Sequence, residues 1–117
     1  MKIVKTEFGI IDDIDYAKDY SSYEPEKYSC VYIDDFAYID DWWERLSTMK
    51  TYFHNMSRPS TGLARWGITL IPPESLSIFQ DIVTTDKRIN NDKHLVDLAE
   101  KIQEAISDNK FMIHFGI

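Results

Sequence analysis

Three groups of closely spaced aspartates are the residues whose type and spacing suit metal chemistry. They are Asp12-Asp13-x-Asp15, Asp34-Asp35 and Asp40-Asp41. Carboxylates of this kind are the ligands that Mg²⁺ and Ca²⁺ prefer. A calcium loop of the EF-hand type that starts at Asp13 fails, because Ala17 and Lys18 stand where an oxygen ligand and a glycine are required. Since neighbouring residues of a strand point to opposite faces, each pair offers one carboxylate to a shared site. We expect no metal site.

Histidine and cysteine chemistry finds little support in the sequence. None of His54, His94 and His114 has a second His or Cys at the spacing of metal ligands, and the chain has no HExxH, CxxC or phosphate-loop motif. Cys30 lies in a short apolar run and is expected to be a buried small hydrophobic residue. The sequence predicts no catalytic residue and no cofactor, so the chain is not expected to be an enzyme. A small metal-dependent enzyme remains the least favoured alternative.

Acidic and aromatic residues are concentrated between Asp12 and Glu44. This stretch holds eleven of the twenty acidic residues and two of the thirteen basic ones, so it carries −9 and the rest of the chain +2. It also holds nine aromatic rings. Disordered acidic segments are poor in rings, whereas Tyr and Trp are enriched in protein interfaces. The composition predicts an ordered surface that binds a basic protein. In the alternative interpretation the rings are core and the carboxylates form a solvated face.

The apolar pattern predicts four strands and three helices. Strands are expected over residues 2–11, 28–33, 65–71 and 111–117, and helices over about 40–56, 73–83 and 92–106. The first helix is expected to be capped by Asp40 or Asp41. Its apolar stripe consists of Ile39, Trp42, Leu46, Met49, Phe53 and Met56. The strand that contains Trp66 is expected to be buried on both sides. The order β-β-α-β-α-α-β predicts an α+β fold, with a right-handed crossover building a mixed sheet of about four strands packed with three helices.

Length and composition bound the class of protein. The chain of 117 residues is expected to form a single domain that spans residues 1–117. The N-terminal residues lack the pattern of an export signal, and no stretch approaches the ~20 apolar residues of a membrane span. We therefore expect a cytoplasmic protein with no membrane contact. The net charge of −7 argues against nucleic acid as a ligand, because phosphate binding needs a basic surface. The oligomeric state is left open.

One segment carries a family resemblance. Residues 63–76, with the sequence LARWGITLIPPESL, resemble the tryptophan-bearing strand that runs into a helix in small bacterial immunity proteins. Such proteins are encoded beside polymorphic or contact-dependent growth-inhibition toxins. The resemblance implies a role and no binding residue: the chain would bind one cognate toxin domain, commonly a basic nuclease, and block it. A different interaction module, such as an adaptor or assembly subunit, would require the same surface.

The predicted partner-binding residues lie around the start of the first helix, because rigid elements present contacts better than loops. Carboxylates there are expected to pair with Arg or Lys of the partner, while aromatic side chains fill pockets. The predicted set is Asp34, Asp35, Tyr38, Asp40, Asp41, Trp42, Trp43 and Glu44.

Overall fold

Six strands form one sheet in the computed structural model, which describes residues 3–117. In spatial order they are β2 (Val31–Asp34), β1 (Lys5–Ile11), β6 (Phe111–Phe115), β5 (Ile68–Ile71), β3 (Lys50–Phe53) and β4 (Pro59–Thr61). Each strand runs antiparallel to its neighbours. All five residues of the central strand β6 are buried. The chain forms a single α+β domain, as the sequence predicts.

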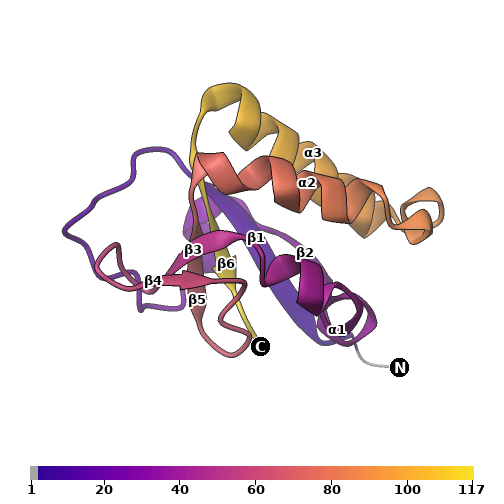
Figure 1. Cartoon of the computed structure of the whole chain (residues 1–117), viewed down its shortest axis with the longest axis horizontal. Coiled ribbons are helices and arrows are strands. Elements are labelled where there is room, and N and C mark those ends of the chain that lie inside the picture. The colour runs from indigo at the N-terminus through magenta and orange to yellow at the C-terminus, as the bar shows by residue number, and fades with distance from the viewer. Residues whose placement is uncertain (1–2) are drawn as a thin grey trace.

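The prediction of a mixed sheet of about four strands is wrong. Two helices separate β5 from β6, α2 (Leu76–Thr84) and α3 (Lys93–Asp108), and they run out and back as an antiparallel pair (Figure 1). The chain therefore returns to the end of the sheet that it left, and β6 lies antiparallel to β5 in place of a crossover. The two additional strands, β3 and β4, arise from residues assigned to the first helix and to a loop.

The first helix begins and ends earlier than the sequence predicts. α1 spans Asp35–Leu46, and the Asp34 carboxylate caps it by accepting the Phe36 N–H. At its end the Ser47 and Thr48 hydroxyls donate to the carbonyls of Trp43 and Arg45, which competes with further helix. Ile39, Trp42 and Leu46 of the predicted stripe are buried on α1, whereas Phe53 is half-buried in β3. The later residues of the stripe are not helical: Met49 lies in the bend before β3, Phe53 in β3 and Met56 in the turn that follows, so their helical spacing is a coincidence.

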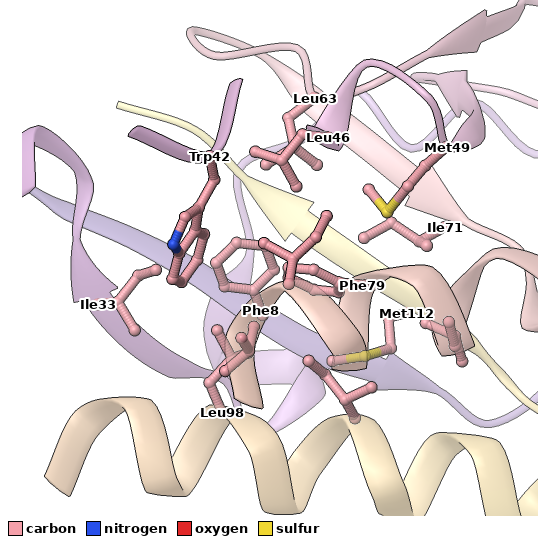
Figure 2. Close-up of a cluster of buried hydrophobic side chains, with 14 of the residues drawn as sticks. Phe8, Ile33, Trp42, Leu46, Met49, Leu63, Ile71, Phe79, Leu98 and Met112 are labelled. Carbon is pink, nitrogen blue, oxygen red and sulfur yellow. The ribbon is translucent and has the colours of Figure 1, made fainter. Parts of the chain in front are cut away.

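The three helices cover one face of the sheet (Figure 1). Between helices and sheet lies the larger core, in which side chains from β1, β6, α1, α2 and α3 meet (Figure 2). Phe8 of β1 packs its ring 5.2 Å from that of Phe79 of α2. Both rings are fully buried, and burial of a side chain this large contributes about 1.5–3 kcal/mol to stability.

The opposite face of the sheet is covered by residues 12–30, here called the strap, which contain one short 3₁₀ helix, Pro25–Tyr28. Tyr20 anchors the strap: its side chain is buried, its N–H donates to the His54 carbonyl at 2.7 Å, and its hydroxyl accepts the Asp15 N–H at 2.9 Å. The ring of Tyr28 packs on Phe115 at 5.9 Å. Residues 12–30 of the acidic, aromatic stretch therefore bury a hydrophobic face of the sheet.

His114 is a core residue at the centre of the sheet. Its Nε2 lies 2.7 Å from the Thr6 hydroxyl of β1, and its Nδ1 lies 3.1 Å from the Thr69 hydroxyl of β5. The ring is buried, and this desolvation lowers the pKa of His114 to about 3. The imidazole is therefore neutral and links three strands.

Acidification is expected to destabilise the fold through His114. Below pH ~6.5 the unfolded chain binds a proton at this imidazole that the folded chain excludes, so the free energy of unfolding falls by up to about 1.4 kcal/mol per pH unit towards pH ~4. Urea titrations across this range, for the parent and for His114→Gln, measure the slope. The variant is less stable at neutral pH, but its stability depends less on pH. Equal slopes would show that His114 is not protected from protonation.

Candidate functional site

The exposed side of α1 presents aromatic rings among carboxylates. Phe36, Asp40, Trp43 and Glu44, here called the α1 ridge, are exposed residues at positions i, i+4, i+7 and i+8 and so lie on one side of the helix. Phe36 is 62% and Trp43 40% exposed. Large rings that remain this accessible on a rigid helix are candidates for protein contacts.

Three predicted contact residues, Asp35, Tyr38 and Trp42, instead face the interior. The Tyr38 hydroxyl donates to the Asp92 carboxylate, and burial together with this hydrogen bond raises the pKa of Tyr38. The indole N–H of Trp42 donates to Asp86 at 2.9 Å. These groups fix α1 against the loops around α3 and are not available to a partner in this conformation.

Arg65 binds α1 on one flank. Its Nη2 and Nε lie 2.6 and 3.0 Å from the Asp35 carboxylate, and its Nη1 binds Asp40. Asp35 is 1% exposed, so this guanidinium compensates a charge that has left water. One Asp35 oxygen, Oδ2, has no hydrogen-bond partner among the described residues.

Arg88 binds α1 on the other flank. Its guanidinium lies 3.2 Å from Asp41, donates to the Ala37 carbonyl at 2.9 Å, and stacks 4.3 Å from the centre of the Tyr38 ring. Asp86 orients it through Nη2 at 2.6 Å. Hydrogen bonds from Arg88 hold the pKa of Asp86 far below its usual range. Asp86 therefore stays charged at a pH at which an ordinary aspartate would already bind a proton.

Trp66 is a further exposed ring, and the sequence predicted that it belongs to a strand buried on both sides. The strand β5 begins only at Ile68, and Trp66 lies in the preceding turn with 77% of its surface exposed. Its ring centre is 5.9 Å from the Arg65 guanidinium, the group that binds Asp35 and Asp40 of α1. The alternating pattern suited a strand, and only the Gly67 that follows Trp66 signals a turn.

Gly116 fixes the turn that carries Trp66. The Gly116 N–H donates to the Gly67 carbonyl at 2.8 Å, and the Ile117 N–H donates to the Arg65 carbonyl at 2.9 Å. A Cβ at Gly116 would lie 2.0 Å from the Arg65 carbonyl oxygen, so only glycine permits this approach. Trp66 is thus presented by a rigid support.

The predicted acidic surface is divided between two parts of the molecule. Five of its carboxylates lie at the cap and along α1, and six lie on the strap, which covers the other face of the sheet. The strap carries Asp12, Asp13, Asp15, Asp19, Glu24 and Glu26. On α1, Asp35, Asp40 and Asp41 are already paired with arginines. Because these three are paired, the negative field at α1 is weaker than the composition implies. Glu44 has no ion pair among residues 3–117.

The described residues hold no group of three or more His, Cys, Asp or Glu side chains arranged to bind a metal. Cys30 is half-buried, and burial raises the pKa of its thiol to about 12, which leaves it protonated and unreactive. None of the helices in residues 3–117 has the length and apolar character needed to cross a bilayer.

No family model, no curated protein and no solved structure matches this chain. The function of the protein is therefore inferred from the geometry of the α1 ridge and Trp66.

Removal of the Arg65 guanidinium is expected to destabilise the protein strongly. Arg65→Met leaves Asp35 buried without its cation, at a cost of about 3 to 5 kcal/mol in the free energy of unfolding, as measured by urea denaturation. The double variant Arg65→Met with Asp35→Leu removes both charges and should recover much of this loss. A single variant within ~1 kcal/mol of the parent would mean that the pair behaves as a solvent-exposed one.

Proposed function

We propose that this chain is an immunity-type protein that binds and neutralises a basic bacterial toxin through the α1 ridge and Trp66. The observation that supports the proposal is the exposure of three large rings, Phe36, Trp43 and Trp66. The first two lie on α1, which Arg65 and Arg88 bind, and Trp66 lies in the turn that packs against Gly116. Aromatic side chains on a preorganised surface lose little entropy on binding and dominate interface energy.

Charge supports a basic partner. The chain has a net charge of −7 and a pI near 4.8, and opposite fields can raise association rates by up to ~10³ at low salt. Asp40 and Glu44 are exposed on the same side of α1 as the rings of the ridge. Asp40 is bound by Arg65, so Glu44 is the ridge carboxylate that a Lys or Arg of the partner would meet. The resemblance of residues 63–76 to immunity proteins points to a toxin as that partner, and Trp66 lies within this segment. The interaction would take place in the cytoplasm.

Co-expression tests the proposal. The open reading frame immediately upstream should encode a C-terminal domain that stops growth, and this chain should restore growth and co-purify with that domain. The triple variant Phe36→Ala, Trp43→Ala and Trp66→Ala is expected to lose rescue, because it removes the exposed rings without touching the core. The matched control Ile78→Ala with Val96→Ala, which truncates exposed apolar residues of α2 and α3, should rescue like the parent. Thermal unfolding of both variants should show that each remains folded.

A parent chain that neither rescues nor binds the upstream domain would remove the toxin assignment. Rescue by the triple variant would move the contact surface away from the α1 ridge. Binding to a partner that does not inhibit growth would favour the alternative function, an adaptor or assembly subunit.

Reversal of one ridge charge should act on the association rate. Glu44→Lys is expected to slow association with a basic partner, with a smaller change in the dissociation rate and a weaker dependence on salt. Glu44 suits this test because it forms no ion pair within the described part of the chain. Surface plasmon resonance at two salt concentrations measures both rates, and Glu100→Lys on α3 changes the net charge equally. An equal effect of the two variants would show that net charge alone is responsible.

A further inference from the structure

A hollow lies at the end of the sheet where β1 and β5 finish and β6 begins. It measures about 620 Å³ and is formed where the start of the strap meets the β3–β4 hairpin, the Pro72–Glu74 turn and the turn into β6. Figure 1 shows the strap leaving the end of β1 on the side away from α1. A volume of this size is within the range of pockets that bind small molecules.

Aromatic rings form part of its lining. Tyr16, Tyr52 and Phe111 line it from the strap, β3 and β6, and Tyr16 meets Phe111 edge to face with ring centres 6.4 Å apart. Tyr16 is 66% exposed, so much of its ring surface remains free. Ring faces of this kind attract cations, and they attract a planar guanidinium in particular.

Carboxylates exceed cations in the same lining. Asp12, Asp13 and Glu74 line the hollow together with a single basic residue, Lys110. The Lys110 amine lies 2.9 Å from Asp12 and neutralises that carboxylate. Asp13 and Glu74 are both exposed and have no ion pair among residues 3–117. The hollow therefore retains negative charge that an entering cation would neutralise.

We infer that this hollow is a binding site for an arginine side chain of a basic protein segment, with Asp13 and Glu74 binding the guanidinium and Tyr16 stacking on it. Arginine is favoured over lysine because its planar fork both stacks on rings and binds carboxylates with two hydrogen bonds. The site goes beyond the proposed function, since it uses different residues from the α1 ridge and a different face of the sheet.

A titration with blocked tripeptides tests this site in the full chain. Acetyl-Gly-Arg-Gly-amide is added to ¹⁵N-labelled protein, and the citrulline analogue, which keeps the shape without the charge, is the reference. The arginine peptide is expected to shift the amide resonances of Asp13, Tyr16 and Glu74 saturably, and the citrulline peptide is not.

Variants separate the site from general charge attraction. Asp13→Asn with Glu74→Gln should weaken peptide binding at least about tenfold, because it removes both free carboxylates. The control Glu100→Gln with Glu104→Gln makes the same change in net charge on α3 and should alter affinity less than about twofold. Tyr16→Leu should weaken binding and Tyr16→Phe should preserve it, since the ring and not the hydroxyl makes the contact.

The inference is overturned if the peptide does not saturate, if the shifts map elsewhere, or if both double variants weaken binding equally. The result is separable from the test of the α1 ridge, because Phe36→Ala and Trp43→Ala should leave peptide binding unchanged. A failed rescue together with successful peptide binding would reject the toxin assignment and keep the arginine site.

Discussion

The buried charge of Asp35 is the constraint on which the arrangement around α1 depends. A carboxylate that is 1% exposed requires a partner, and Arg65 supplies it from a turn thirty residues further along the chain. Because the same guanidinium also binds Asp40, it ties both the buried and the exposed side of α1 to the start of β5. Trp66 follows directly in the chain, and its ring lies 5.9 Å from this guanidinium.

Arg88 makes a corresponding set of contacts on the other flank, so an acidic helix is held between two cations from distant segments. This pairing reduces the repulsion between carboxylates on α1 and so allows the helix to pack on the sheet. Carboxylates clustered on one helix repel one another, yet the helix must pack its apolar side on the sheet. With three of its carboxylates paired to Arg65 and Arg88, α1 keeps its rings exposed while part of its negative charge is neutralised. The aromatic side chains therefore carry more of the proposed interface than the acidic composition by itself indicates.

The strap is also rich in acidic and aromatic residues, but its role is to cover the second face of the sheet. One face of the antiparallel sheet is covered by helices, and without the strap the other face would leave Leu70, Ile113 and Phe115 in water. Tyrosines suit this position, because the rings bury apolar area while the hydroxyls remain hydrogen-bonded, as Tyr20 does with the Asp15 amide. The same segment leaves Tyr16 exposed in the hollow that Asp13 and Glu74 also line.

The amino-acid sequence was sufficient to predict the features that depend on local pattern: an α+β domain, the strands around Phe8 and Ile113, the helices α2 and α3, and the apolar side of α1 through Ile39, Trp42 and Leu46. Trp43 and Glu44, which the sequence predicted as partner contacts, are exposed on α1, and their role as contacts stays a prediction. Folding in three dimensions set the antiparallel course of β6, the strand state of residues 50–53, the burial of Tyr38 and Trp42, and the exposure of Trp66. The physical reason is that each of these depends on contacts between residues far apart in the chain. The spacing of apolar residues predicts only which side of a helix or strand a residue such as Phe53 or Trp66 would face if that element formed. A hydrogen bond such as that from Trp42 to Asp86 does not depend on any periodic pattern, and neither does the ion pair between Asp35 and Arg65. The partners in such contacts therefore cannot be predicted from the spacing of residues.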